Sequence, residues 1–447
     1  MRRGRFFTRV RGGGTRFQLY PQPPVLATYS DPITVELSPP AGSLGVGPHD
    51  ERMCVIAPLG KMESYGQILL REGRRQPTLP PWRGPVADPA RPGPDGGFAH
   101  LEPDDPTFLQ AHAYACVRFA LDVWEDYLGR AVPWYFLRQH RWLEIGLLGE
   151  HYDNGEVGRG WLELGHNRAT DRSSHPFALN FDVIAHEVGH LIVYGIVGEA
   201  DEAGFGAEYA GFHEAAADLV ALLAAAHLEP VVEQVMDRTR GNLYVANELN
   251  RMGELSSQAQ IRIASNSARM SEFALGWSDE HDLSEPLTGA IFDLLLDIYQ
   301  ANLVDRGLIP RSLAQLSDEF GHLRAFAPMI QAEFDRWYPR APQEFCEAFA
   351  DARDQLGAAL AYVLLNLRPD RVNFVAVRDA LLEADRRWGG RFAPAIAENF
   401  AWRGIGTVEI GPYLGPRTVA AARVRIGLHR CAKREIGAWR GQVARQA

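Results

Sequence analysis

The sequence predicts an α+β protein in which a mixed α/β lobe precedes a mainly α-helical lobe. Before residue 181, short β-like runs alternate with glycine and proline around a single long helical pattern. Beyond that point, helical periodicity covers nearly everything to Arg403. At 447 residues the chain is long enough for two or three packed units, and its sequence shows no fixed-period repeat of the kind that predicts a solenoid.

The bulk composition is that of a soluble globular protein. Hydrophobic residues make up 46% of the chain and charged residues 23%. The net charge of −10 argues against nucleic acid as a partner, and the sequence has no uninterrupted run of about 18 apolar residues that would predict a membrane span. The composition leaves the oligomeric state open.

The first residues and the cysteines predict a cytoplasmic protein. Twin arginines follow Met1, but the apolar stretch that an export signal needs does not come after them. Basic residues gather at both ends of the chain, where we expect solvated tails. The cysteines lie far apart, form no metal-type pair and suit a reducing compartment: Cys54, Cys116, Cys346 and Cys431.

Changes in composition divide the chain into five expected segments. Nine prolines between residues 77 and 106 indicate a linker or an extended wrapping segment. The segments are an irregular β-containing N-terminal unit at 1–76, the proline-rich linker at 77–106, the mixed α/β lobe at 107–205, the helical lobe at 206–410 and a basic C-terminal tail at 411–447.

Local signals predict the helices and strands within these segments. Acidic residues and proline at 104–106 favour a helix start, and Gly129 favours a helix end after Leu128. Strand-like runs lie at 33–37, 53–57, 132–137 and 161–164, with a turn at 153–155 before the last of them. Helical patterns follow at 182–195, 207–228, 286–305, 342–366, 371–388 and 392–402.

Two histidines four residues apart stand in the predicted helix 182–195. On a helix, His186 and His190 project from one face about one turn apart, so both imidazoles can bind one zinc ion. Glu187 lies one step around the helix, where it can reach a water on that ion without being a ligand, and so can act as general base. The alternative is an ordinary amphipathic helix whose two histidines have structural partners.

A catalytic zinc ion needs a third protein ligand and one open position for water. Glu214 and Asp218 share one face of the predicted helix 207–228, which suits Glu214 as the ligand and Asp218 as the acceptor of a ligand imidazole's outer N–H. Gly189 and the three alanines between the two acids would allow this helix to approach the first closely. Two alternatives remain: Glu214 is a surface carboxylate, or His213 is the ligand.

These residues resemble the gluzincin zinc metallopeptidases, in particular the thermolysin-like and fungalysin-like families. The metal motifs that carry the resemblance are HEVGH at 186–190 and EAAAD at 214–218. Looser similarity follows in EPLTGAIFDLL at 285–295, in 374–385 and in NFAWRGIG at 399–406. The similar region runs from about residue 105 to 410.

The resemblance implies a thermolysin-like arrangement, with an edge strand in the mixed lobe, then the active-site helix and the helical lobe. It implies that His281 donates a hydrogen bond to the oxyanion of the transition state. Residues 151–165 are the candidate for the edge strand, along which an extended peptide would pair. Tyr209, Arg262 and Arg269 do not align cleanly with the family, so they receive no role. Residues 1–100 resemble nothing in it.

The function expected from these motifs is that of a zinc-dependent peptidase, most simply an endopeptidase, acting on a peptide or protein substrate. Zinc and Glu187 would activate water against the peptide carbonyl, and Glu187 would pass the proton to the leaving amine. Two alternatives stay open. One is a catalytically idle relative that keeps the fold as a binding or scaffold protein, and the other is a zinc hydrolase of a non-peptide amide.

Overall fold

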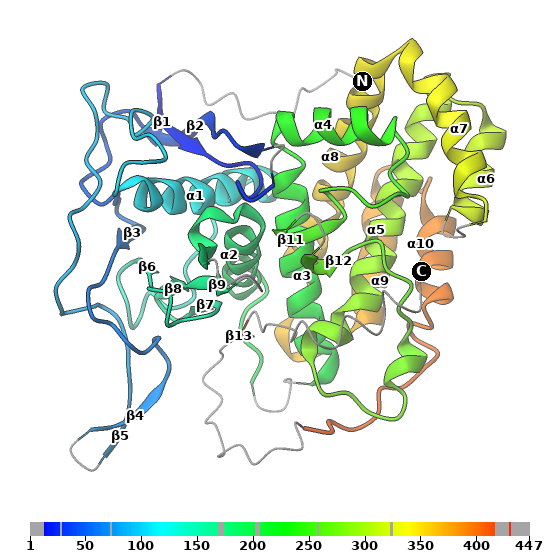
Figure 1. Ribbon diagram of the computed structural model, residues 1–447. Helices are drawn as coiled ribbons and strands as arrows, with labels where there is room; N and C mark the ends of the chain where they lie inside the picture. Colours follow the sequence, from blue (N-terminus) through cyan, green and yellow to red (C-terminus); the bar gives the residue numbers. More distant parts are fainter. Residues whose placement is uncertain are drawn as a thin grey trace.

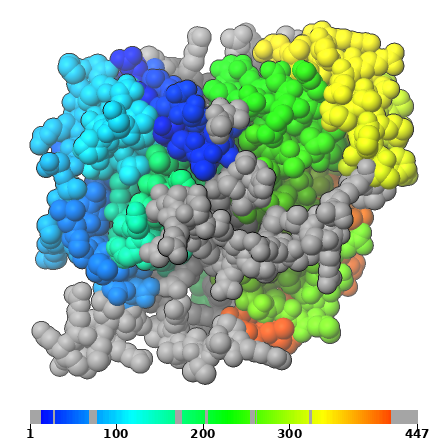
Figure 2. Space-filling view, in the orientation of Figure 1, coloured from blue at the N-terminus to red at the C-terminus, as the bar shows by residue number. Residues whose placement is uncertain are grey.

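The computed structural model describes residues 13–26, 29–71, 74–168, 174–201, 206–256, 259–321, 325–415 and 429–430. Most of the two basic ends, and Cys431, lie outside these residues. Strands β1 to β10 and the first two helices occupy one side of the molecule, and the later helices occupy the other, with β11 and β12 beside α3 (Figure 1). The space-filling view shows the same division, with the early part of the chain on the left and the part beyond residue 200 on the right (Figure 2). The α+β class predicted from the sequence is confirmed.

Within the described residues, the strands form one five-stranded sheet and four two-stranded sheets. The large sheet has the order β13-β7-β8-β6-β3, in which β3, β6 and β8 are parallel and β7 and β13 are antiparallel to their neighbours. The strands are β1 (Gly14–Leu19), β2 (Ile33–Pro40), β3 (Met53–Ile56), β4 (Ile68–Arg71), β5 (Arg74–Pro77), β6 (Leu143–Leu147), β7 (Gly155–Gly158), β8 (Trp161–Leu164), β9 (His166–Arg168), β10 (Ser174–Pro176), β11 (Arg251–Ser256), β12 (Ala259–Ile263) and β13 (His429–Arg430).

Helices make up most of the chain after β10. The α-helices are α1 (Phe108–Leu128), α2 (Phe181–Ile196), α3 (Ala207–Ala225), α4 (Glu229–Thr239), α5 (Glu280–Asp305), α6 (Arg311–Phe320), α7 (Ala327–Trp337), α8 (Pro342–Asn366), α9 (Phe374–Arg387) and α10 (Ala393–Trp402). In Figure 1, α3 stands between α2 on the strand side and α5 on the helical side. It therefore joins the two halves of the molecule.

Helix α1 ends where its sequence predicts and begins at Phe108, just after the predicted start at 104–106. The Asp105 carboxylate accepts hydrogen bonds from the backbone N–H and the hydroxyl of Thr107, just before the first helical residue. Gly129 ends the helix in the left-handed conformation, with φ of 65°, which glycine adopts without steric cost. Most of the helix surface is buried, so α1 is a central core element.

The N-terminal and proline-rich segments pack onto α1. Phe98 stacks on Phe17, with ring centroids 5.0 Å apart, and Phe17 stacks in turn on Tyr114 of α1. The Ala90 N–H donates to the side chain of Gln110 on the same helix. Strand β3 also pairs with β6 of the large sheet, so the early chain contributes to the main core. The five segment boundaries stay a prediction.

The predicted helices form. Among the described residues, the helices α4, α6 and α7 were not predicted, and neither were the strands β1, β4, β5, β6, β9, β10, β11, β12 and β13. The strand expected at 132–137 is wrong, because this stretch is irregular and β6 forms just after it. Pro133 has no N–H to give to a sheet. Phe136 and Trp134 are nevertheless buried, and the Trp134 indole donates to the backbone carbonyl of Arg52.

Helix α5 begins six residues earlier than its apolar pattern indicates. The Asp279 side chain accepts from the backbone N–H of His281 and caps the helix there, which leaves Pro286 inside the helix. Among the described residues, α5 is long and apolar enough to cross a membrane, but 72% of its most apolar stretch is buried inside the protein. Helices α3 and α4 would pass the same test only together, and they are bent by 89°. Buried core helices of this kind are common in globular proteins.

A buried arginine fixes the segment that follows β12. The Arg403 side chain is 1% exposed and donates to the side chain and backbone carbonyl of Asn266, to the Ala268 carbonyl and to Asp293 of α5. A side chain at Gly289 would overlap the guanidinium, so this glycine makes the space that Arg403 fills. The end of the β11–β12 hairpin is thereby held against α5 and α10.

Candidate metal centre

Helix α2 carries two of the candidate ligands and is capped at its start. The Asn180 side chain accepts from the Val183 N–H in the first turn. The Asp182 carboxylate, also in the first turn, accepts from the Gln22 side chain at 3.2 Å and from the Gly253 backbone N–H at 3.2 Å. One of these partners precedes the large sheet in the chain, and the other belongs to the β11–β12 hairpin. Both fix the position of α2.

Helices α2 and α3 cross in close contact beside the candidate ligands. A Cβ atom built on Gly189 would lie 2.5 Å from the Cα atom and 3.0 Å from the carbonyl oxygen of Ala217. Only glycine fits at that position. The sequence-based expectation that Gly189 and the alanines allow a close helix contact therefore agrees with the structure.

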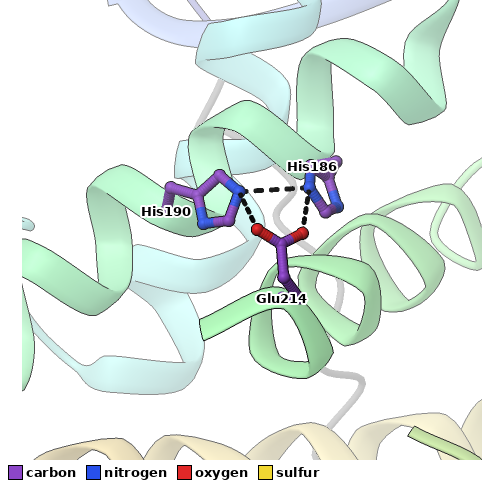
Figure 3. A group of neighbouring side chains, drawn as sticks. All are labelled: His186, His190 and Glu214. Atoms are coloured by element: carbon purple, nitrogen blue, oxygen red, sulfur yellow. Dashed lines mark hydrogen bonds and ion pairs between the residues drawn. The ribbon is translucent and has the colours of Figure 1, made fainter. Parts of the chain in front are cut away.

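Three side chains from these helices converge (Figure 3). The Nε2 atoms of His186 and His190 lie 3.1 Å apart, and the two oxygens of Glu214 lie 3.3 Å from His186 Nε2 and 3.6 Å from His190 Nε2. All three side chains are buried. The structure thus brings together the three residues that the sequence predicts as ligands, and their binding of a metal stays a prediction.

The donor set and its spacing suit a catalytic metal ion. Two imidazole nitrogens and one carboxylate oxygen form a common protein ligand set that leaves an open position. Donors at about 2.1 Å from a tetrahedral ion are roughly 3.4 Å from one another. The two Nε2 atoms are 3.1 Å apart, and each lies 3.3–3.6 Å from one of the two Glu214 oxygens, Oε2 for His186 and Oε1 for His190. One atom from each residue can be chosen so that all three lie within 4.8 Å of one another.

Asp218 contacts the outer nitrogen of His186, and the Arg262 guanidinium lies 2.9 Å from Nδ1 and 3.2 Å from Nε2 of the same ring. The Asp218 Oδ1 atom lies 2.8 Å from His186 Nδ1, and the Arg262 guanidinium lies 2.7 Å from the same oxygen. Burial alone would raise the pKa of Asp218, but Arg262 and His186 outweigh it and lower that pKa, so the carboxylate is ionised. Arg262 comes from β12, and its role was not predicted because the hairpin was missed.

Glu187 is a buried carboxylate beside the converging ligands. Its side chain is 0% exposed, and neither oxygen has a hydrogen-bond partner among the described residues. Burial raises its pKa to about 8, with His186 opposing and Glu214 adding to this increase. A Cβ atom on Gly155 of β7 would lie 3.6 Å from Glu187 Oε1, so the start of β7 borders this carboxylate.

His281 reaches the same group from α5. Its Nε2 atom lies 3.2 Å from a Glu214 oxygen, and its Nδ1 atom lies 2.8 Å from Asp279 Oδ1. Burial lowers the pKa of His281, but Glu214 and Asp279 outweigh it, and the pKa is raised. The sequence suggested that His281 lies in a loop before the helix. In the structure it stands in the first turn of α5.

The remaining candidates lie outside the converging group. His213 neighbours Glu214 in sequence, but its Nδ1 atom lies 2.8 Å from Nδ1 of His190, on the outer side of that ring. Glu214 is the residue that points toward both histidines. The Tyr209 hydroxyl donates to the Gly198 carbonyl. The Arg269 guanidinium lies over the Trp402 ring, 4.0 Å from its centroid.

Comparison with known proteins adds one distant likeness. No protein-family model and no curated protein matches the sequence. Among solved structures, the chain is similar to the precursor of protealysin, a metalloproteinase from Serratia proteamaculans. The two are 13% identical, the match covers 72% of this chain and 83% of that chain, and the TM-score is 0.44. Because this similarity is distant, we interpret the site from its own residues alone.

Replacing Asp218 by alanine should weaken metal binding without unfolding the protein. Loss of the carboxylate leaves the outer nitrogen of His186 without its acceptor, and the expected loss in zinc affinity is about 10–100-fold. Asp218→Asn keeps one acceptor oxygen and should lose less. Competition with a chromophoric chelator measures both affinities. An Asp218→Ala protein with the affinity of the parent would show that this carboxylate does not orient the ligand.

Proposed function

We propose that the protein is a zinc-dependent peptidase. The observation that carries the proposal is the juxtaposition of a buried three-donor group with a buried carboxylate, Glu187, that has no hydrogen-bond partner among the described residues. Burying a carboxylate in this state is costly, and such groups concentrate where chemistry needs them. His186, His190 and Glu214 would hold the ion, whose nitrogen and oxygen ligands suit zinc.

The residues around the ion have distinct proposed tasks. Bound zinc supplies Lewis-acid polarisation and lowers the pKa of water. Glu187 accepts the proton from the attacking water and delivers it to the leaving amine. A pKa raised toward neutrality allows both transfers near pH 7, and a nearby cation would lower it again. His281, held at Nδ1 by Asp279, presents Nε2 to the negative charge that develops on the carbonyl oxygen.

The edge of the large sheet supports a peptide as the substrate. Strand β7 pairs with β8 on one side and with the two-residue strand β13 on the other, in antiparallel register at Val157 and Glu156. The outer edge of β7 thus accepts a short antiparallel segment of the chain itself. An extended peptide bound in the same manner would run beside Glu187, because β7 starts at that carboxylate.

Metal analysis combined with digestion of a peptide library tests the proposal. The purified protein should contain one zinc ion per chain, and mass spectrometry should detect cleavage that a chelator abolishes and added zinc restores. Absence of bound zinc at this site would overturn the proposal. Stable zinc binding without cleavage of any peptide would exclude the peptidase and favour an idle binding protein or an amide hydrolase.

His281→Ala should lower kcat by about 10²–10³-fold, the effect of removing one donor to the oxyanion. Zinc content and KM should change little, because the imidazole is not assigned to binding either the ion or the ground-state substrate. His100→Ala, which removes an exposed histidine, is the matched control and should retain full activity. A His281→Ala enzyme with undiminished kcat would remove this residue from the proposed machinery.

A further inference from the structure

His213 lies against the outer face of a proposed metal ligand. It precedes Glu214 on α3 and its side chain is 0% exposed. Its Nδ1 atom lies 2.8 Å from Nδ1 of His190, and the two rings are nearly parallel, with an interplanar angle of 25°. A separation of 2.8 Å between two ring nitrogens is a hydrogen bond, so one nitrogen carries the hydrogen and the other accepts it.

The direction of this hydrogen bond follows from the position of His190. Its Nε2 atom faces His186 and Glu214, so Nε2 is the nitrogen available to a metal ion. A neutral imidazole that binds metal through Nε2 carries its hydrogen on Nδ1. His190 therefore donates from Nδ1, and His213 accepts at its own Nδ1. This requires a neutral His213 whose hydrogen is on Nε2.

The two candidate ligand histidines consequently have different outer partners. His186 faces the ionised Asp218 carboxylate, whereas His190 faces an imidazole. Aromatic side chains surround His213, with the ring centroids of Tyr194 and Tyr209 at 4.3 Å and 5.6 Å from its own. This packing restricts rotation of the His213 ring. The acceptor nitrogen is thus held in one direction, toward His190.

We infer that His213 is a positioning residue that fixes the tautomer and ring orientation of His190 and is not itself a ligand. The inference rests on the proposed zinc site. Removing the outer hydrogen-bond partner of a metal-binding histidine lowers metal affinity by about 10–100-fold, because the partner fixes the tautomer and the orientation of the ring before the metal binds. Loss of the His213 acceptor should therefore lower zinc affinity, and this change can be measured without any assay of hydrolysis.

Three variants test the role of His213. His213→Phe keeps a ring but removes the acceptor, and it should weaken zinc binding by about 10–100-fold. His213→Asn restores an acceptor oxygen and should recover most of that loss. His100→Phe, the same substitution at an exposed histidine, is the control and should bind zinc as the parent does. Chelator competition gives the affinities, and thermal melts of the zinc-free proteins report any general loss of stability.

Nitrogen-15 spectra of the histidine rings in the zinc-loaded parent protein provide a second test that needs no variant. They should show His213 neutral, with its hydrogen on Nε2. Equal zinc affinity of His213→Phe and the parent, equal losses in His213→Phe and His213→Asn, or a hydrogen on Nδ1 of His213 would each overturn the inference. A parent protein that binds no zinc would instead overturn the proposed function, so the two failures are distinguishable.

Discussion

Glu187→Gln should abolish most hydrolysis and leave zinc in place. The substitution keeps the size of the side chain but removes its ability to accept a proton, and losing a general base lowers kcat by about 10²–10⁴-fold. Zinc affinity should change little, because the proposed ligand group consists of His186, His190 and Glu214 without this carboxylate. Folding should not suffer, since a neutral amide is easier to bury than a carboxylate whose pKa burial has raised to about 8.

Single-turnover kinetics and metal analysis on the same Glu187→Gln preparation separate chemistry from binding. Glu233→Gln, the same substitution at an exposed position of α4, is the control and should retain parental kcat. Loss of zinc in Glu187→Gln would mean that this carboxylate takes part in holding the ion. Parental turnover would mean that another group is the base.

Gly189→Ala should disrupt the metal centre from a position that contributes no ligand atom. The added methyl group would lie 2.5 Å from the Ala217 Cα atom, so the helices must separate by roughly 1 Å to reach an ordinary carbon–carbon contact. That movement carries Glu214 and Asp218 away from the histidines of α2. We expect zinc affinity to fall by about 100-fold or more, which is at least as large as the effect of removing one outer hydrogen-bond partner. The free energy of unfolding should fall by about 1–3 kcal/mol.

Two further variants show whether the loss in Gly189→Ala comes from the helix crossing. Gly206→Ala, at the start of α3, places its methyl group where no atom lies within 4 Å, and it should bind zinc as the parent does. Adding Ala217→Gly to Gly189→Ala should not restore affinity, because the clash is with backbone atoms of residue 217. Full zinc affinity in Gly189→Ala alone would show that α2 and α3 adjust without moving the ligands.

The convergence of His186, His190 and Glu214 could be predicted because its geometry is local to two helices. A spacing of four residues puts His186 and His190 on one face, and the same spacing relates Glu214 to Asp218. Helical periodicity then fixes which faces are buried. Arg262 could not be found in this way, since it reaches Asp218 from a hairpin whose strands pair through the backbone. Only the alternating pattern of 259–263 hinted at that strand.

The strand prediction at 132–137 failed because these residues are partly buried without pairing with a neighbouring strand. The stretch 132–137 has the apolar and aromatic side chains of a strand, and several of them are buried. Its burial comes from packing against neighbouring segments, whereas β6, which begins at Leu143, makes the parallel pairs with β3 and β8. A hydrophobic pattern indicates which side chains are buried. It does not indicate which neighbouring strand, if any, a segment pairs with, because strand formation depends on the surrounding structure.

The anchoring of α2 by Asp182 bears on the order of events during folding. Its carboxylate is held by Gln22 and Gly253, which are 160 and 71 residues away along the chain. Contacts between such distant residues carry a large loop-closure cost and form late, whereas a helix forms within microseconds. The two histidines can therefore be helical long before α2 is seated, and acquisition of tight metal binding during refolding should coincide with the slowest long-range step.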